Sequence, residues 1–495
     1  MKERRSRRDD ARPPQDDDVG RPGERIEDPI LRILPAGANE EPPASALRKA
    51  DPGAHDEADT GGPPAGRAGV TEAKRRGPLG LLQLLGPGLI TGASDDDPSG
   101  IGTYSQVGSQ FGYGLLWTAI ATFPAMAAVQ ELCARIALQT GVGLGTSLRR
   151  RFPSWLVGLC ILALFAANTF NVGADLGAVA AGGSLLTGGA IAGIWLLVPV
   201  AAGIFALQLF LTYAAIFKIF KWLTIALFAY VVTAVLAHPD LRQVVVGTLV
   251  PHIELTNDFV AALVAILGTT ISPYLFFWQA SSEVDEMRAA GKATEDERRK
   301  TNREELRAAR TDIFVGMLFS NLVMYAIMLT SGAVLHAHGK TGVETAGQAA
   351  QALEPLAGQW AFVLFAAGMI GTGLLAIPIL TGSASYAVRD FFGLKGALAD
   401  KPRYRPTFYA IMALSTIAGV AIDLVGINPI RALFLSAVIN GLVAPPVLVL
   451  IILLGSDRRV MDRYASGRLS RVLTWATAAA MSVAAVALVV TALAP

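Results

Sequence analysis

Residues 86–100 read GPGLITGASDDDPSG, and this stretch is the strongest indication of the fold. It begins as the first long apolar segment of the chain and then places three consecutive aspartates inside that segment, at positions 95–97. Acidic side chains at membrane depth cost several kcal/mol each unless they face a cavity or a partner. Pro98 removes a backbone donor, and Gly100 adds conformational freedom. The stretch therefore predicts a membrane helix that is unwound here, with free carbonyls beside carboxylates, which is a hard-cation site in physical terms.

The sixth apolar segment contains a second break, where residues 268–274 read GTTISPY. Pro273 has no N–H, so a carbonyl near Thr269, four residues back, loses its helical partner. The hydroxyls of Thr269, Ser272 and Tyr274 stand close by in sequence. Taken alone, this segment has a simple proline kink as an alternative explanation. The triple aspartate in the first segment argues against that alternative when the two segments are considered together. Broken helices at corresponding places five segments apart are typical of an inverted-repeat transporter.

The composition places the chain in a membrane. Of its 495 residues 52% are hydrophobic and 17% are charged, whereas soluble domains carry about 25% charge. The apolar residues come in runs long enough to cross a bilayer core. The net charge of +2 gives no indication of nucleic-acid binding, and Cys133 and Cys160 are too few for a disulfide framework or a thiolate site. The chain has no Walker-type phosphate-binding loop, so we do not expect it to hydrolyse ATP. As a predicted carrier it is not expected to be an enzyme.

Two regions are predicted along the chain. Residues 1–76 are rich in charged residues, Pro and Gly, with almost no aromatic ones, and are predicted to form a disordered cytoplasmic tail. Residues 77–495 are predicted to form an all-α transmembrane transporter domain of about eleven helices. The spans are expected near 79–111, 113–139, 154–183, 188–211, 214–237, 257–287, 312–336, 358–388, 405–425, 429–455 and 469–493. Repeat one would cover about 79–237, repeat two about 257–455, and an extra helix about 469–493.

Basic residues fall on alternate loops and predict the orientation. The loops between spans 2 and 3, 6 and 7, 8 and 9, and 10 and 11 are rich in Lys and Arg, and Lys218 and Lys221 flank the junction of spans 4 and 5. The opposite loops hold only Arg242, Lys340 and Arg431. By the positive-inside rule the N-terminus is cytoplasmic and the C-terminus outside, in a multi-pass protein of the cell (inner) membrane.

The chain resembles the Nramp metal transporters (natural resistance-associated macrophage proteins). The resemblance runs from Gly86-Pro87-Gly88 through Asp97-Pro98-Ser99-Gly100 to residues 108–117, GSQFGYGLLW. Further matches are Gln130, Ala134-Arg135, Thr140-Gly141, Asp175-Leu176 and Thr381-Gly382, so that most of residues 79–455 are covered. The resemblance implies a LeuT-like fold, with five-plus-five inverted repeats and one extra helix. It also implies an ion held between the breaks in helices 1 and 6.

The chain departs from the family pattern at several ligand positions. The helix 1 motif Asp-Pro-Gly-Asn reads Asp97 to Gly100 here, so the Asn ligand has become glycine. The helix 6 motif Met-Pro-His reads Ser272-Pro273-Tyr274, which replaces a thioether with a hydroxyl and a titratable His with Tyr. A Gln near helix 10 aligns with Ala437, and the helix 3 Asp-x-x-Glu pair reads Asp175 and Ala178.

These departures favour harder ions and weaker proton coupling. Oxygen-only ligands suit Mg²⁺ and Mn²⁺, whereas a thioether prefers softer ions. The chain therefore resembles the divergent Nramp-related branch, where magnesium transport is known. The family's proton route uses the helix 6 His and the helix 3 Glu, and both are missing here. We expect transport that is uncoupled or only weakly coupled to protons, although the remaining carboxylates leave a proton route open.

The predicted function is secondary transport of divalent metal ions such as Mn²⁺, Fe²⁺ or Mg²⁺ by alternating access. The metal is the transported substrate, no cofactor is expected, and the partners are the ion and the lipid bilayer; the oligomeric state stays open, a monomer included. The main alternative is a LeuT-fold, cation-coupled carrier of a small organic substrate such as an amino acid, whose carboxylate the three aspartates would repel. An intramembrane aspartyl protease would need a second catalytic Asp in another helix, and the available Asp175 lacks a matching motif.

The candidate site residues come from both breaks and from neighbouring helices. The candidate metal ligands are Asp97, Asp96, Gly100, Thr269, Ser272 and Tyr274, and an ion or proton pathway would use Asp95, Asp175 and Glu283. For Glu283, a solvated position at the end of helix 6 is the alternative.

Overall fold

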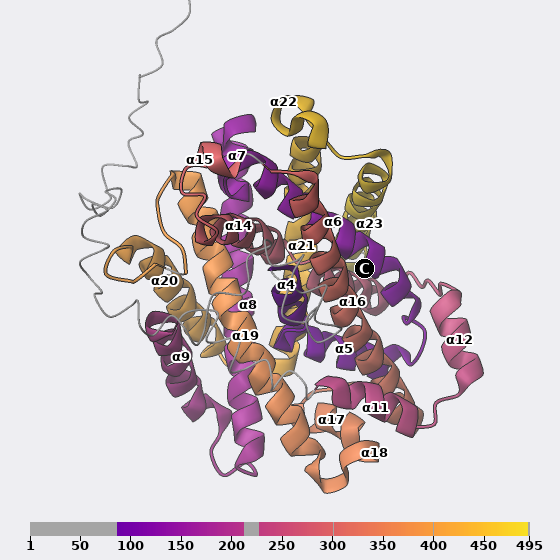
Figure 1. The fold of residues 1–495 in the computed structure, drawn as a ribbon. Helices are drawn as coiled ribbons and strands as arrows, with labels where there is room; N and C mark the ends of the chain where they lie inside the picture. The colour runs from indigo at the N-terminus through magenta and orange to yellow at the C-terminus, as the bar shows by residue number, and fades with distance from the viewer. Residues whose placement is uncertain (1–86, 212–226, 300, 399, 494–495) are drawn as a thin grey trace, which may run out of the picture. The chain divides into compact units, whose positions relative to one another are not determined.

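The computed structural model describes residues 87–211, 227–299, 301–398 and 400–493, and these residues form helices and connecting turns (Figure 1). The predicted tail at 1–76 and the two lysines between spans 4 and 5 lie outside the described residues. Within the described ranges, eight helical segments are long and apolar enough to cross a membrane. The predicted all-α membrane fold is thus confirmed.

Most helices of the first half follow the predicted spans, whereas the helices at 144–151 and 241–249 lie in segments predicted to be loops. In chain order the helices are α4 (Pro87–Asp95), α5 (Pro98–Phe111), α6 (Trp117–Thr140), α7 (Leu144–Arg151), α8 (Ser154–Leu186), α9 (Gly193–Phe210), α11 (Phe228–Leu236) and α12 (Leu241–Leu249). The first span is divided into α4 and α5, as the triple aspartate predicts. Of the fifth span only the end, α11, lies within the described residues.

The second half repeats this order, beginning again with a broken helix. Its long helices are α13 (Asn257–Thr270), α14 (Pro273–Ala289), α16 (Arg303–Val334), α19 (Ala361–Phe392), α20 (Pro406–Asp423) and α21 (Pro429–Ser456), and α23 (Arg468–Leu493) follows as the extra helix. The short elements between them are α15 (Glu295–Arg298), η4 (His336–His338), α17 (Ala346–Ala350), η5 (Gln351–Leu353), α18 (Glu354–Ala357), η6 (Gly358–Trp360), α22 (Arg458–Met461) and η7 (Asp462–Tyr464).

Several of these short helices occupy segments that we expected to be loops. Two of them begin with a capping box, in which a Thr side chain and a residue three positions later cap each other's backbone N–H groups. Thr294 and Glu297 do this at α15, and Thr345 and Gln348 do it at α17. The signal is present in the sequence, but each helix is too short to show an apolar period.

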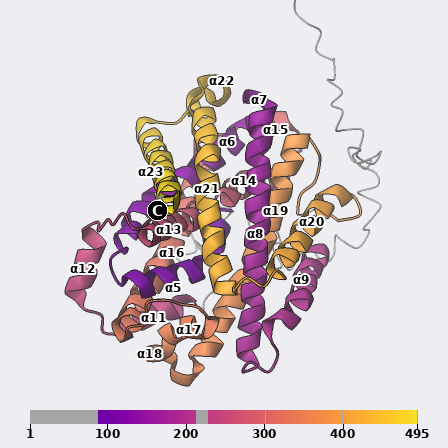
Figure 2. The same cartoon turned by 180° about the vertical axis from the view of Figure 1, so that it is seen from behind.

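The broken helices lie in the middle of the bundle. α4 and α5 pack on α16, α13 packs on α21, and α14 packs on α6 and α19. The long helix α8 contacts α19, α20 and α21, and Figure 2 shows it beside α21. Both breaks are therefore enclosed by other helices, which shield their free backbone groups from lipid.

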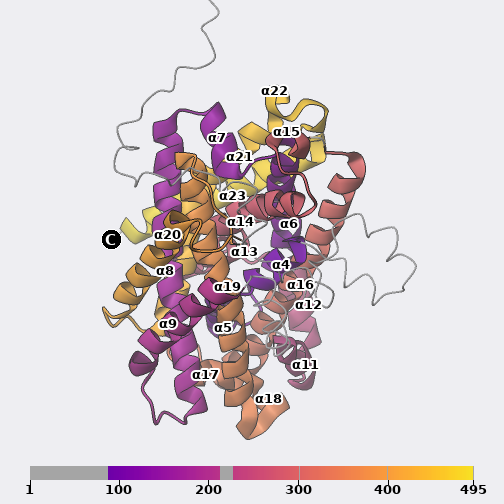
Figure 3. The same ribbon diagram turned by 60° about the vertical axis from the view of Figure 1, so that its left-hand side comes forward.

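The connecting elements gather at two opposite ends of the bundle. Figures 1 and 3 show α7, α15 and α22 at one end and α11, α17 and α18 at the other. The Arg-rich loops between spans 2 and 3, 6 and 7, and 10 and 11 are the ones that hold α7, α15 and α22. The basic residues thus share one end, as the alternate-loop pattern requires.

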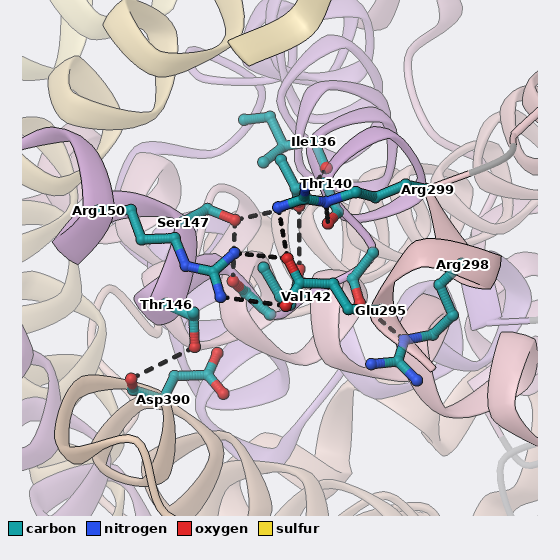
Figure 4. A network of polar contacts seen from close by, with 12 residues as sticks. Ile136, Thr140, Val142, Thr146, Ser147, Arg150, Glu295, Arg298, Arg299 and Asp390 are labelled. Carbon is teal, nitrogen blue, oxygen red and sulfur yellow. Dashed lines mark hydrogen bonds and ion pairs between the residues drawn. The ribbon is translucent and has the colours of Figure 1, made fainter. Parts of the chain in front are cut away.

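At the basic end, α15 is clamped between α6 and α7 (Figure 4). Arg150 donates two hydrogen bonds to Glu295, at 2.6 and 3.1 Å. Arg298 donates to the Gly141 carbonyl at 2.7 Å and Arg299 to the Thr140 carbonyl at 3.2 Å. These guanidinium groups satisfy carbonyls at the end of α6, where the helix dipole favours a cation. We call this arrangement the α7–α15 clamp.

Candidate functional site

The break in the first span is organised by Asp97. Its backbone is extended (φ −66°, ψ 169°), and it is the N-cap of α5. Oδ1 of Asp97 accepts a hydrogen bond from the Gly100 N–H at 2.8 Å and one from the Ser99 hydroxyl at 2.6 Å. Pro98 at the first helical position has no N–H to satisfy, so the chain can leave one helix and begin the next here.

The side chain of Ser272 hydrogen-bonds to the backbone at the break in the sixth span. Its hydroxyl lies 2.7 Å from both the Gly268 and the Thr269 carbonyl oxygens. The Thr269 carbonyl is the one that Pro273 leaves without a helical donor, so Ser272 compensates for the missing N–H. The Ser272 hydroxyl hydrogen therefore points back along its own helix, while its lone pairs stay available to a cation.

The two breaks meet at the carboxylate of Asp97. Oδ2 accepts a hydrogen bond from the Tyr274 hydroxyl at 3.2 Å and another from the Asn171 side-chain amide at 3.2 Å. The Tyr274 hydroxyl also lies 3.2 Å from the Ser94 carbonyl oxygen. Residues of α8 and α14 thus converge on one buried carboxylate at the start of α5.

Gly100 and Thr269 also face each other. A Cβ atom built on Gly100 would lie 3.4 Å from the Thr269 hydroxyl oxygen, 3.4 Å from the Asp95 carbonyl oxygen and 3.2 Å from the ring of Tyr104. At the position where the family carries Asn, the space beside Gly100 is therefore bordered by the Thr269 hydroxyl, the Asp95 carbonyl and the Tyr104 ring. Oxygen atoms from both broken helices border this space.

Asp95 and Asp96 turn toward α16 instead. Oδ2 of Asp95 lies 2.7 Å and Oδ1 of Asp96 3.3 Å from the hydroxyl of Ser320. A serine hydroxyl has one hydrogen, so it can donate to only one of these carboxylates. The other oxygens, Oδ1 of Asp95 and Oδ2 of Asp96, are buried without a hydrogen-bond partner among the described residues. The two aspartates form a separate polar cluster beside the Asp97 carboxylate.

Asp175 and Glu283, two residues of the predicted ion or proton pathway, are both buried. Asp175 is buried on α8, one turn after Asn171, close enough to Asp97 for their charges to interact. Glu283 is buried on α14 and accepts a hydrogen bond from Gln279 at 3.1 Å. Gln279 in turn accepts one from Thr91 of α4 at 2.5 Å. A solvated position at the end of helix 6 is therefore wrong for Glu283, because its side chain is fully buried in the interior of α14's packing against the other helices.

Two residues of α16 that contact the first broken helix, Ser320 and Asp312, were given no role in the sequence analysis. Asp312 of α16 accepts hydrogen bonds from the N–H groups of Gly88 at 2.6 Å and Leu89 at 3.2 Å. It therefore caps the first turn of α4 from another helix. The only sequence signal was the presence of polar residues in otherwise apolar spans.

The oxygen atoms around the two breaks belong to different kinds of chemical group. Within the described residues no group of three or more His, Cys, Asp or Glu side chains is placed to hold a metal ion. The oxygens around the breaks are instead a carboxylate, backbone carbonyls and hydroxyls, from Asp97, Asp95, Thr269, Ser272 and Tyr274. Such neutral and anionic oxygens suit Mg²⁺, Ca²⁺ and Mn²⁺.

Comparison with known proteins gives a consistent result. The family described as natural resistance-associated macrophage protein-like (Nramp) matches residues 88–491. The divalent metal cation transporter MntH of Deinococcus radiodurans is 28% identical over 427 residues, which are 83% of this chain and 91% of that protein. MntH of Klebsiella pneumoniae is 26% identical over 415 residues, 80% of this chain and 91% of that protein.

Solved structures show the same fold. A mutant form of the manganese transporter of Eremococcus coleocola matches with a TM-score of 0.63 at 19% identity, covering 82% of this chain and 86% of that one. Mhp1, a nucleobase-cation-symport-1 family transporter, matches with a TM-score of 0.51 at 16% identity, covering 82% and 93%. At these identities the likeness concerns the fold alone.

Proposed function

Because the chain belongs to the Nramp family, whose model matches most of its length, we propose that it is a secondary carrier of divalent metal ions that works by alternating access. Its relatives in the comparison carry the name of divalent metal cation transporters. The observation that carries the proposal is the Asp97 carboxylate, which touches side chains from both a broken first-repeat helix and a broken second-repeat helix. A cation bound there draws the two repeats together.

The proposed ion site lies between the breaks. Asp97 supplies the charge, and the backbone and hydroxyl oxygens near Gly100, Thr269, Ser272 and Tyr274 supply neutral ligands. Asp96, with Asp95, adds negative charge on the α16 side. Ion binding would exchange the hydrogen bonds of Asp97 for metal–oxygen contacts.

The proposed selectivity follows from the ligands. A centre built from oxygen atoms discriminates weakly between Mn²⁺ or Fe²⁺ and Mg²⁺, because the ligand that would prefer softer ions is absent. A divalent ion gains about 4.6 kcal/mol per 100 mV on crossing the membrane potential inward. The potential therefore suffices as a driving force, and the Tyr and Ala that replace the family's His and Glu argue against stoichiometric proton coupling.

The orientation belongs to the same proposal. The end of the bundle that carries α7, α15 and α22 is the basic one, so it faces the cytoplasm. The N-terminus then lies inside and the C-terminus outside a cell membrane.

Uptake into liposomes that contain a metal indicator and an internal pH dye tests this function. Metal influx that follows an imposed inside-negative voltage, without acidification, is the expected result. Acidification in fixed proportion to metal influx would overturn the uncoupled mechanism, and absence of influx for Mn²⁺, Fe²⁺ and Mg²⁺ alike would overturn metal transport itself. Liposomes without protein are the control for leak.

A further inference from the structure

A pocket lined by arginines lies at the basic end of the molecule. Its volume is about 320 Å³. Its basic side chains come from three elements far apart in sequence: Arg135 of α6, Arg303, Arg307 and Arg310 of α16, and Arg463 of η7. The pocket is separate from the ion site between the breaks.

The positive charge of this pocket is not neutralised by the described residues. Among them, Glu131 is the only carboxylate in the lining, and it is already ion-paired with Arg135. Within the part of the chain that the structure describes, the other four arginines form no ion pair with a carboxylate, and all four are exposed. Guanidinium groups gathered around one cavity repel one another, and an oxyanion that accepts from several of them removes this repulsion.

The face of α16 that carries these arginines continues as an apolar stripe. Phe314, Leu318 and Leu322 follow Arg310 at intervals of four residues, so they form a stripe that begins beside Arg310 and winds gradually around the helix. They are 49%, 48% and 45% exposed, which places them toward lipid. Phe314 to Leu322 covers about 12 Å of helix, close to the roughly 15 Å depth of one leaflet.

We propose that this pocket binds the phosphate of an anionic phospholipid of the cytoplasmic leaflet, whose acyl chains lie along the apolar stripe. Guanidinium groups match the geometry of phosphate oxygens, and basic pockets between membrane helices are suited to lipid headgroups. A lipid with net negative charge is favoured over a zwitterionic one, because the latter brings its own ammonium group into a cluster of cations. Soluble phosphate would contact the arginines, but it has no acyl chains that could lie along the apolar stripe.

Lipid binding to the full chain tests this proposal independently of transport. The purified protein in detergent is titrated with dioleoylphosphatidylglycerol and, separately, with dioleoylphosphatidylcholine, and bound lipid is measured by native mass spectrometry. The test variant combines Arg303→Gln, Arg307→Gln and Arg310→Gln. The control variant combines Lys401→Gln, Arg403→Gln and Arg458→Gln, which remove the same charge from exposed positions outside the pocket.

We expect the test variant to bind phosphatidylglycerol about a hundredfold more weakly, since each basic side chain near a membrane surface contributes a factor of roughly five. The control variant should bind it as the unmodified protein does, and phosphatidylcholine should bind weakly to all three. Should the test variant not fold, Arg307→Gln alone should weaken binding about fivefold.

Three results would overturn the proposal. Equal losses in the test and control variants would mean that only overall charge matters. Equal binding of the two lipids would mean that the pocket does not recognise net negative charge. Displacement of phosphatidylglycerol by millimolar inorganic phosphate, or equally tight binding of glycerophosphoglycerol, would show that the ligand is a soluble phosphate and that the stripe has no part in binding.

Discussion

The hydroxyl of Tyr274 lies 3.2 Å from Oδ2 of Asp97, and this contact joins residues that are 177 positions apart. It places the break of the sixth span directly against the break of the first. Since Tyr274 also reaches the Ser94 carbonyl, it contacts both sides of the first break. Movement of either broken helix must therefore alter the environment of the Asp97 carboxylate.

Replacing Asp97 should abolish metal uptake. Asp97→Asn keeps an oxygen that can cap α5, because Asn is about as good an N-cap as Asp, but it removes the charge that a divalent ion needs. Asp97→Ala removes both and should also lower the free energy of unfolding by about 1 kcal/mol. The measurement is uptake into liposomes together with a thermal unfolding curve. Ser99→Ala, which deletes one donor to the same carboxylate, serves as the control and should keep uptake; normal uptake by Asp97→Asn would reject the site.

Ser272 should set the preference between hard and soft ions. Ser272→Met introduces a thioether at the second break and should shift the preference from Mg²⁺ toward Cd²⁺, because sulfur binds softer ions. Competition uptake checks this, with Thr270→Met as a neighbouring control. In the unmodified protein millimolar Mg²⁺ should inhibit Mn²⁺ uptake, and Mn²⁺ uptake that ignores Mg²⁺ contradicts the argument from ligand softness.

Asp312 should hold α4 against α16. Asp312→Ala leaves the first N–H groups of α4 without their acceptor, which should cost about 1 kcal/mol and lower the initial uptake rate. Asp312→Asn retains an acceptor oxygen and should restore most of that rate. If both variants transport equally slowly, the carboxylate charge rather than the cap is what α4 requires.

The α7–α15 clamp should weaken in acid. Hydrogen bonding to Arg150 lowers the pKa of Glu295 below its ordinary value of 4.5. Because the pKa of Glu295 is lower in the folded state, the stabilisation is complete when the pH is above the unfolded-state pKa. It is lost as the pH falls through the folded-state pKa. Because both side chains are partly exposed, the contribution should be no more than about 1 kcal/mol at low salt.

Thermal unfolding of Glu295→Gln measures this contribution. The difference from the unmodified protein should be present at neutral pH and should vanish in acid once the Glu295 carboxyl is protonated in the folded state, and added salt should reduce it. Glu344→Gln, an exposed carboxyl at the opposite end, should show no such difference. A pH-independent difference would mean that Glu295 acts by packing.

The orientation predicts which positions a membrane-impermeant thiol reagent reaches. Asp296→Cys in α15 should react only from the cytoplasm, and Leu493→Cys, at the end of α23, only from outside. The two native cysteines are buried, so they should give little background. Labelling of both positions from one side would contradict the eleven-span arrangement.

Much of this protein follows from its sequence alone. Long apolar runs require membrane helices, since an exposed backbone cannot exist in hydrocarbon. Two local anomalies, the aspartates before Pro98 and the hydroxyls around Pro273, predict both breaks because each depends only on residues within one helical turn. The all-α fold, the broken first and sixth helices and the family were therefore accessible before the structure, whereas the ion site itself stays a prediction.

What surrounds those breaks depends on the tertiary structure. Asn171 and Tyr274 meet at Asp97, and Ser320 draws Asp95 and Asp96 toward α16, because helices distant in sequence pack there. The burial of Glu283 and the gathering of arginines from three elements into one pocket arise in the same way. Local sequence determines where a helix ends, but the neighbour of a side chain depends on helix packing, which no short stretch of sequence encodes.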